Sequence, residues 1–378
     1  PYHNKDFQDF KSFMITSLKQ SHRSQSSLWR QFGLLIAPSF LALSTVLTSC
    51  SVSTNQATST SPANTPANTP SKSADKPVAI KTKVIRVGYQ SSGDLTKVRG
   101  VLEKRLEPLG VKVEWSQFAA SPQLMETLNV GKVDIGSVGE TPPIFTQAAG
   151  SQLVYVVARK PSEGKGSGII VQKDSPIKTV ADLKGQKVVF QKGSASHYLI
   201  VKALEEVGLK YSDIQPVTLP PVEAREAFFQ GKIDAWVTWD PYLALAETKG
   251  NGRIIRDANK IATQGGFYIV SRSFTTDNLD LIRIVIEEID KNGEWAEANR
   301  AEVVKLVAPI LKIEPEIQEI VTSRASYRLR PISPQIIENQ QKIADLFTQE
   351  KVIPKKLDLR EVTLTPEQYA AITPDSLK

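Results

Sequence analysis

The sequence predicts an α/β fold made of two lobes with a ligand cleft between them. The chain has 378 residues, of which 40% are hydrophobic and 23% are charged, and this is enough apolar mass for two packed domains. Short β-branched segments alternate with amphipathic segments that end at glycine, as expected for the strands and helices of a parallel or mixed sheet. One pattern of residues also occurs twice along the chain, which indicates that the two lobes are related.

The repeated pattern lies at an offset of 100 positions. Its two copies are Gly131-Lys-Val-Asp-Ile-Gly-Ser-Val-Gly-Glu140 and Gly231-Lys-Ile-Asp-Ala-Trp-Val-Thr-Trp-Asp240. Each copy begins Gly-Lys-apolar-Asp, ends in an acid and follows a predicted helix that starts at proline. Upstream, Val87-Gly-Tyr-Gln90 corresponds to Val188-Val-Phe-Gln191. Any two α/β units share some likeness, but the matching order of these parts favours a true repeat.

The individual elements follow from local patterns. The first lobe is predicted to start with a strand at 84–90, one amphipathic helix from Leu95 to a stop at Gly110, a strand at 111–115 and a helix from Ser121 to Gly131. In the second lobe, Thr179 and Asp182 form a predicted capping box before a short helix. Further helices are predicted at about 196–207, 279–298, 299–308, 315–323 and 334–350.

These patterns divide the chain into five parts. We predict a signal peptide at 14–49, a tether at 50–83, the first part of lobe 1 at 84–172, lobe 2 at 173–265, and the return to lobe 1 with the C-terminal helices at 266–378. The carboxyl ends of parallel strands are where open α/β sheets bind ligands, so facing lobes of this kind predict a cleft at those ends.

The N-terminal region is typical of a lipoprotein signal. A basic stretch after Met14 leads into an apolar run at 32–46, which is 15 residues long and contains Pro38. This run is shorter than the roughly 20 residues that a membrane-spanning helix needs. Leu47-Thr48-Ser49-Cys50 then resembles the bacterial lipobox, whose cysteine receives lipid and becomes the first residue of the mature protein. An ordinary signal peptide with a chance cysteine is the alternative.

The segment after Cys50 is rich in Ser, Thr, Pro, Ala and Asn as far as Lys83 and includes a tandem Pro-Ala-Asn-Thr. Such a segment has little apolar surface to bury, so we predict a disordered tether. Together with the lipobox, it predicts a domain anchored by lipid to the membrane, in the periplasm or at the cell surface. Residues 1–13 fit neither the signal nor the tether.

Composition excludes several classes of function. The single cysteine excludes a structural disulfide and a thiolate metal site, and three histidines, two of them before residue 23, disfavour a histidine metal cage. The net charge of +7 is spread too diffusely for a nucleic-acid partner. Motifs of serine hydrolases, zinc proteases and P-loop nucleotide-binding proteins are missing. We therefore predict a protein without enzyme activity, cofactor or metal.

Two strand-to-helix junctions are the strongest binding candidates. At the first, Gly193-Ser-Ala-Ser-His197 offers free N–H groups of a helix start and the hydroxyls of Ser194 and Ser196, which together suit an anion. The second, Gly139-Glu-Thr-Pro-Pro143, has Thr141 as a capping residue. Serine and threonine at helix starts are usually structural, but two such junctions facing one cleft favour a ligand.

Aromatic and acidic residues crowd the edge of the second lobe. Trp239 and Asp240 end a predicted strand, and Trp239 can cover an organic ligand. Strand alternation places Trp236 and Thr238 on one face and Val237 and Trp239 on the other, so Trp236 is expected in the core. Glu140 and Asp240 occupy equivalent positions of the repeat. They would repel a bare anion, so we expect each to pair with a cation across the cleft or to hold the hinge closed.

Several motifs resemble one family. They are Val87-Gly-Tyr-Gln90, Val138-Gly-Glu-Thr-Pro-Pro143, Lys192-Gly-Ser194, Gln215-Pro-Val-Thr-Leu-Pro-Pro221 and Asp234-Ala-Trp-Val-Thr-Trp-Asp-Pro-Tyr242. The chain resembles, over about 84–350, the aliphatic sulfonate-binding proteins of bacterial ABC importers. This resemblance implies a periplasmic-binding-protein-like clamshell of type II that closes on an alkanesulfonate and delivers it to a membrane permease. We expect a monomer.

The expected site combines the two junctions. Gly193, Ser194, Ala195, Ser196 and His197 are predicted to hold the anionic head group from one lobe, and Gln90, Gly139, Glu140 and Thr141 to approach from the other. Trp239 and Asp240 are predicted to lie beside the tail. A sulfonate is permanently ionised and only accepts hydrogen bonds, so neutral donors are expected to suffice without a buried counter-charge.

Other ligands and functions remain open at this point. Taurine, nitrate or another small oxyanion is the alternative within the same class. Thiamine-pyrimidine synthase relatives are enzymes that resemble this group in sequence, but they require a cysteine-rich motif that a chain with Cys50 alone does not have. A sensor domain that binds its ligand for signalling is the third alternative.

Overall fold

The structure is a computed structural model that describes residues 80–90, 94–262 and 265–378. The predicted signal peptide, the lipidation at Cys50, most of the predicted tether and the turn at 91–93 lie outside the described residues. Within the described ranges, no helix is both long enough and apolar enough to cross a membrane.

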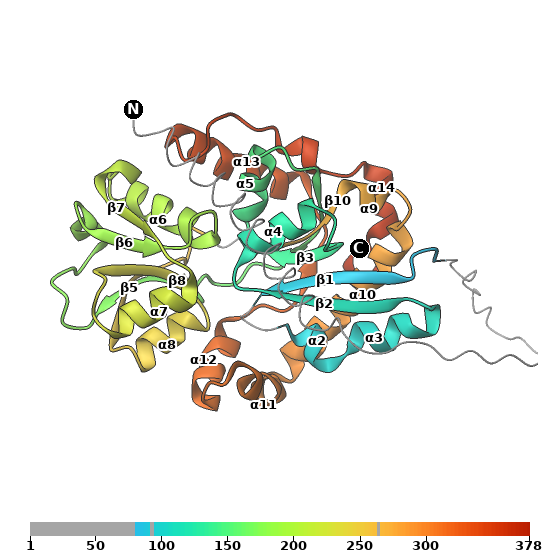
Figure 1. Ribbon diagram of the computed structural model, residues 1–378, viewed down its shortest axis with the longest axis horizontal. Helices are drawn as coiled ribbons and strands as arrows, with labels where there is room; N and C mark the ends of the chain where they lie inside the picture. The colour runs from blue at the N-terminus through green and yellow to red at the C-terminus, as the bar shows by residue number, and fades with distance from the viewer. Residues whose placement is uncertain (1–79, 91–93, 263–264) are drawn as a thin grey trace, which may run out of the picture. The chain divides into compact units, whose positions relative to one another are not determined.

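The first lobe is built on a six-stranded mixed sheet with the order β11-β4-β10-β3-β1-β2 (Figure 1). Strand β1 pairs in parallel with β2 and β3, and β10 lies antiparallel between β3 and β4. The strands are β1 (Val84–Gln90), β2 (Lys112–Phe118), β3 (Ile135–Val138), β4 (Leu153–Arg159), β10 (Phe267–Ser271) and β11 (Leu329–Arg330).

The second lobe is built on a five-stranded sheet with the order β7-β6-β8-β5-β9. Here β6 pairs in parallel with β7 and β8, and β5 lies antiparallel between β8 and β9. The strands are β5 (Ser167–Gln172), β6 (Lys187–Phe190), β7 (Gln215–Thr218), β8 (Ala235–Trp239) and β9 (Gly252–Asp257). The predicted boundary after residue 172 falls at the end of β5, whereas sheet pairing places all of β5 in the second lobe.

The repeat in the sequence corresponds to a repeat in the structure. Gly131 and Gly231 both adopt a positive φ, +69° and +65°, where glycine is favoured because it has no Cβ. The carboxylate of Asp134 accepts a hydrogen bond from the N–H of Arg86 at 2.8 Å, and Asp234 accepts one from the N–H of Lys187 at 3.2 Å. Each aspartate therefore ties the start of its strand to the neighbouring parallel strand, which is β1 in the first lobe and β6 in the second.

Helices cover both faces of each sheet (Figure 1). In the first lobe α4 and α5 contribute to one core and α3 to the other, while in the second lobe α6 lies opposite α7 and α8. Their bounds are α2 (Leu95–Arg99), α3 (Val101–Leu106), α4 (Ser121–Asn129), α5 (Pro142–Ala148), α6 (Ala195–Glu206), α7 (Pro221–Phe229) and α8 (Tyr242–Thr248). The single helix predicted after Leu95 is wrong, because Gly100 adopts a φ of +60° and divides it into α2 and α3.

The chain returns to the first lobe at β10 and continues into the C-terminal helices. These are α9 (Arg272–Thr275), α10 (Leu279–Ala298), α11 (Arg300–Leu311), α12 (Pro315–Arg324), α13 (Pro334–Gln349) and α14 (Pro366–Ile372). The helices predicted at 279–298, 299–308, 315–323 and 334–350 agree with α10 to α13. The predicted capping box at Thr179 is also present, on a short 3-10 helix (Val180–Leu183).

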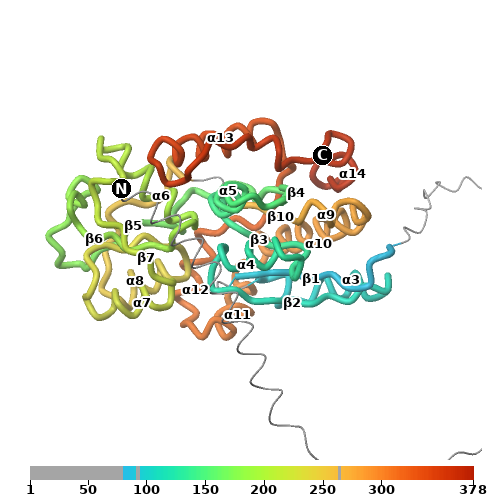
Figure 2. Tube along the Cα trace, turned by 45° about the horizontal axis from the view of Figure 1, so that its top comes forward, coloured from blue at the N-terminus to red at the C-terminus, as the bar shows by residue number. Residues whose placement is uncertain are grey.

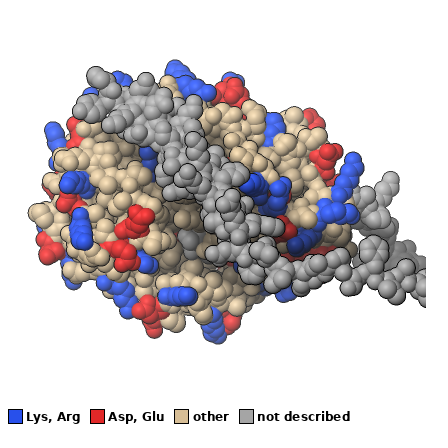
Figure 3. Space-filling model, in the orientation of Figure 1, with Lys and Arg blue, Asp and Glu red and all other residues tan. Residues whose placement is uncertain are grey.

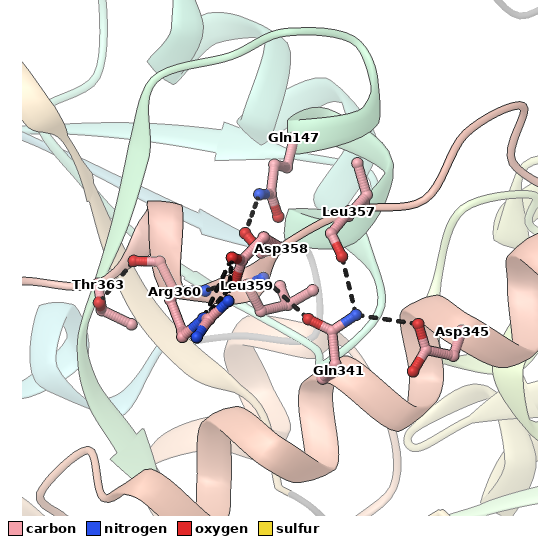
Figure 4. A network of polar contacts seen from close by, with 8 residues as sticks. All are labelled: Gln147, Gln341, Asp345, Leu357, Asp358, Leu359, Arg360 and Thr363. Carbon is pink, nitrogen blue, oxygen red and sulfur yellow. Dashed lines mark hydrogen bonds and ion pairs between the residues drawn. The ribbon is translucent and has the colours of Figure 1, made fainter.

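A polar network fastens the segment after α13 to the first lobe (Figure 4). Gln147 of α5 donates to the carbonyl of Asp358 at 2.8 Å. Gln341 of α13 donates to the carbonyl of Leu357 at 2.8 Å and accepts from the N–H of Leu359 at 3.0 Å. Figure 2 shows α13 running alongside α5, whose N-terminal end carries the predicted junction at Glu140. The network therefore helps to fix the helix that positions this junction.

The charged side chains are mixed over the face shown in Figure 3, with basic and acidic residues interspersed. Exposed ion pairs such as Lys305–Glu302 at 2.6 Å and Lys342–Glu338 at 2.9 Å are typical of this surface. Pairs of this kind contribute little to stability, about 0–1 kcal/mol each.

A substitution in α10 tests the packing of the helices beside the cavity. A Cβ on Gly293 would lie 2.3 Å from the carbonyl oxygen of Tyr327. Alanine gains about 1 kcal/mol in helix propensity over glycine, but overpacking against backbone costs about 1–3 kcal/mol or more. We therefore expect Gly293→Ala to destabilise the protein. Urea unfolding checks this, with the exposed Glu294→Ala as control, and equal or higher stability of Gly293→Ala would contradict the described contact.

Candidate functional site

A cavity of about 390 Å³ lies where the strand ends of the two lobes meet. The first lobe contributes the ends of β1, β3 and β4, and the second lobe contributes the end of β8 and the turn between β6 and α6. Ligand sites of α/β sheets are expected at such ends, and this volume falls in the usual range for small-molecule pockets, roughly 300–1,000 Å³.

The cavity brings together most of the residues that the sequence predicts for the site. Those that line it are Gln90, Gly139, Glu140, Ser194, Ala195, Trp239 and Asp240. The predicted residues that do not line it are Thr141, Gly193, Ser196 and His197. The lining set comes from both lobes, and a Cβ on Gly139 would lie 3.3 Å from the Cβ of Ala195. The two junctions therefore approach each other closely, as the repeat predicts.

The serine junction offers mainly a backbone donor. Ser194 Oγ donates to the carbonyl of Gln191 at 2.7 Å and accepts from the N–H of Ser196 at 3.2 Å, so its hydroxyl proton already has a partner. Ala195 is the first residue of α6, where the helix provides no acceptor for its N–H. The N–H of Ala195 is thus the better candidate donor at this junction.

His197 lies beneath this junction in an aromatic cluster. Its ring centroid lies 4.9 Å from that of Phe190, 5.4 Å from that of Phe347 and 5.5 Å from that of Phe145. The side chain is fully buried, and this burial lowers the pKa of His197 to about 3, so the imidazole is neutral. Its Nδ1 accepts from the N–H of Gly193 at 3.3 Å, which fixes the turn that precedes α6.

Glu140 is a buried acid in the cavity wall, with 5% of the residue exposed. Its backbone carbonyl accepts a hydrogen bond from Gln340 of α13 at 2.7 Å. Burial raises the pKa of Glu140 to about 7, because removal from water disfavours the carboxylate. The expected pairing with a cation is not found: among the described residues, no basic side chain lies within ion-pairing distance of Glu140.

Asp240 does form the expected pairing across the cavity. Its Oδ1 accepts from the N–H of Ala244 at 3.0 Å and lies 3.4 Å from the guanidinium of Arg324, which also binds Glu247 at 2.8 Å. Arg324 ends α12, which follows the return of the chain to the first lobe, so this ion pair joins the two lobes. Burial raises the pKa of Asp240 to about 6 despite the attraction to Arg324.

Arg159 is a functional candidate that the sequence analysis missed. It ends β4, lines the cavity and donates to Ser137 Oγ at 2.7 Å and to the Tyr268 hydroxyl at 3.2 Å. No carboxylate of the described residues lies within ion-pairing distance of its guanidinium. The cavity therefore does contain a counter-charge for an anion, contrary to the expectation of neutral donors alone. The sequence feature that could have revealed Arg159 is a single basic residue at the end of a strand of six apolar residues.

The remaining wall of the cavity has an apolar part and a polar part. The apolar side chains come from α2, α6, α11, α12 and the segment after α12: Leu95, Leu199, Val303, Val307, Val321 and Tyr327. The polar part includes five serines: Ser121, Ser137, Ser162, Ser167 and Ser326. The described residues contain no group of three or more His, Cys, Asp or Glu arranged to hold a metal ion. A cation at the strand ends and an apolar wall suit an organic anion with an apolar part.

Two separate α/β sheets, with a cavity lined by strand ends of both, define a two-lobed ligand-binding protein. Residues 107–302 match the family described as NMT1/THI5 like. The chain is 40% identical over 290 residues to a protein of Escherichia coli (strain K12) named for the binding of aliphatic sulfonates, covering 76% of this chain and 90% of that protein. The chain belongs to this family of sulfonate-binding relatives, as its motifs predict.

Solved structures agree with this family and with the predicted fold class. The alkanesulfonate-binding protein SsuA from Xanthomonas axonopodis pv. citri, bound to MOPS, is 36% identical with a TM-score of 0.71, over 75% of this chain and 98% of that one. The periplasmic aliphatic sulphonate binding protein SsuA from Escherichia coli is 39% identical with a TM-score of 0.68, over 76% and 93%. The fold is thus that of periplasmic binding proteins, and both of these relatives are named as binding proteins.

The burial of Glu140 predicts a pH-dependent stability. The pKa of Glu140 in the folded protein, about 7, lies above its ordinary value of 4.5. The neutral carboxyl therefore makes its full contribution to the free energy of unfolding below pH 4.5, and this contribution is lost as the pH rises through 7. Glutamine is neutral and of equal size. The free energy of unfolding of Glu140→Gln should therefore equal that of the wild type at about pH 4 and exceed it by on the order of 3 kcal/mol at about pH 8.

Urea unfolding across this pH range, without ligand, measures the difference. The exposed Glu319→Gln serves as the matched control and should show no such trend. A stability difference between Glu140→Gln and the wild type that stays constant with pH would contradict the buried, protonated carboxyl.

Proposed function

We propose that this protein is the extracytoplasmic solute-binding component of an ABC importer, which captures aliphatic sulfonates and delivers them to the membrane permease. The observation that carries the proposal is Arg159, a cation without an ion-pair partner among the described residues, in a cavity whose wall is partly apolar. A sulfonate remains ionised at all physiological pH values and accepts charge-assisted hydrogen bonds from a guanidinium.

The shape and chemistry of the cavity favour an organic sulfonate over a bare oxyanion. Nitrate or sulfate would fill only a small part of about 390 Å³ and would leave the valine and leucine wall uncovered. An alkyl tail covers that wall and removes apolar surface from water, at roughly 25 cal/mol per Å². The relative from Xanthomonas axonopodis is bound to MOPS, which supports a ligand with a bulky tail. Taurine, with a short and charged tail, is the second candidate.

We further propose a specific arrangement within the cavity. The sulfonate oxygens accept from Arg159 and from the N–H of Ala195, and the tail runs between Trp239 and the apolar wall. Gln90 Nε2 donates to the carbonyl of Ser137 at 3.1 Å, which positions Gln90 at the same end. His197, Ser196, Gly193 and Thr141 act from beneath the cavity by holding the two junctions.

A ligand panel tests the function and the role of Arg159 together. The purified chain should gain thermal stability from methanesulfonate and from longer alkanesulfonates, and a ligand at about 100 times its dissociation constant should add roughly 2.7 kcal/mol. Arg159→Gln should weaken sulfonate binding by about ten- to a hundredfold, because hydrogen bonds to a charged group contribute about 1.5–3 kcal/mol. Titration calorimetry gives these affinities.

Arg159→Lys is the matched variant, since it keeps the charge and should retain part of the affinity. Unchanged melting temperatures of the free variants exclude a folding defect. Stabilisation by nitrate or sulfate alone would overturn the organosulfonate assignment, and wild-type affinity in Arg159→Gln would show that the head group binds elsewhere.

The lipid anchor is a separate proposal, supported by the sequence Leu47-Thr-Ser-Cys50 after the apolar run. Attachment at Cys50 would keep the protein at the membrane, in the periplasm or at the cell surface. We expect the native protein to begin at a lipid-modified Cys50 by intact-mass analysis, and Cys50→Ala to be released or left unprocessed. A mature form with unmodified Cys50 would contradict the anchor without affecting the binding function.

A further inference from the structure

One end of the cavity is formed by the two helices α11 and α12. Val303 and Val307 of α11 face it, and so do Gln318, Val321 and Arg324 of α12, which are spaced three residues apart and therefore lie along one side of the helix. This end consists of apolar side chains with one amide, Gln318, and the guanidinium of Arg324 at its edge.

Gln318 is a buried polar side chain that forms only part of the hydrogen bonds its amide can make. The residue is 2% exposed, and its Nε2 donates to Thr322 Oγ1 at 3.0 Å. The Thr322 hydroxyl is also hydrogen-bonded to the phenol of Tyr327. Gln318 Oε1 is buried and has no hydrogen-bond partner among the described residues. An unpaired buried acceptor is costly, so such an atom at a cavity wall points to a ligand that supplies the missing donor.

A second acceptor at the same end has the same property. Asp240 Oδ1 is used by Arg324 and Ala244, whereas Asp240 Oδ2 is buried without a hydrogen-bond partner among the described residues. Among the described residues, the cavity wall at α12 thus presents unpaired acceptors, while Arg159 presents donors.

We propose that Gln318 is a specificity-determining residue that selects sulfonates whose tail ends in a hydrogen-bond donor, such as a hydroxyl or a protonated amine. This inference rests on the proposed function, because it takes the sulfonate group to lie at Arg159. A plain alkyl tail covers the valines but buries Gln318 Oε1 without a partner. A tail of equal length with a terminal O–H or N–H pairs with that oxygen and still covers the valines.

Three ligands with equal numbers of heavy atoms test the proposal by calorimetry on the full chain. They are butane-1-sulfonate, 3-hydroxypropane-1-sulfonate, which ends in a donor, and 2-methoxyethane-1-sulfonate, which has an oxygen but no donor. The measured quantity is the ratio of the affinity for the hydroxyl ligand to that for the alkyl ligand. In Gln318→Met, which keeps the size and removes the acceptor, we expect this ratio to fall about tenfold.

Two further variants separate specificity from packing. Val321 lies on the same side of α12 as Gln318. The variant Val321→Ala should weaken the binding of all three ligands while leaving the affinity ratio unchanged. Gln318→Glu keeps an acceptor and should retain the hydroxyl preference, with added affinity for 3-aminopropane-1-sulfonate. Melting temperatures of the free variants show that each is folded.

The outcomes distinguish this inference from the proposed function. Sulfonate binding with the same ratio in Gln318→Met and the wild type would overturn the role of Gln318 and leave the proposed function standing. A third outcome is that the methoxy ligand binds more tightly than butane-1-sulfonate by the same factor as the hydroxyl ligand does. That result would show that the amide of Gln318 presents N–H to the ligand, which also overturns the inference. Absence of binding by every sulfonate would overturn both.

Discussion

The return of the chain from the second lobe into the middle of the first sheet constrains the rest of the structure. Strand β10 has to fit between β3 and β4, and Gly266 approaches so closely that a Cβ there would lie 2.4 Å from the carbonyl of Val138. The carbonyl of Gly266 accepts from the N–H of Arg159 at 3.0 Å. This contact therefore joins the end of β3, the end of β4 and the return segment at one point. Gly139 and Arg159, two of the first-lobe residues that line the cavity, are held in place by this contact.

The two lobes are equivalent in their sheets but differ at the cavity because of the C-terminal helices. Glu140 and Asp240 hold corresponding positions after β3 and β8; Glu140 is buried, and the side chain of Asp240 is 10% exposed. In the described part of the chain only Asp240 meets a cation, because α12 places Arg324 beside it. The helices that follow the repeat thus give the two equivalent acids different surroundings. They also supply the valine wall, so the binding properties of the cavity depend on a part of the chain that the repeat does not include.

The sequence predicted the features that depend on local pattern. The glycines and aspartates of the repeat, the capping box at Thr179 and the long C-terminal helices are all set by residues close in sequence. It did not predict Arg159, Gln318 or Arg324 as cavity residues, because their position depends on how β4, α11 and α12 pack against distant strands. His197 shows the same limit: its place after a glycine turn suggested a ligand contact, whereas packing of Phe145 and Phe347 from the first lobe encloses it.

The charges along the cavity explain how it can accept an anion although two acids line it. With every group ionised, the lining residues Arg159, Lys160 and Arg324 give +3 and Glu140 and Asp240 give −2, so the sum is +1. Arg324 is paired with Asp240 and Glu247, whereas Arg159 and Lys160 have no ion pair among the described residues, although Arg159 attracts the carboxylate of Asp94. Since the pKa of Glu140 is raised to about 7 by burial, this acid is partly protonated near neutral pH. A nearby sulfonate disfavours the carboxylate further, because like charges repel strongly where water is excluded. In the proposed complex, the uncharged acid therefore does not oppose the anionic ligand.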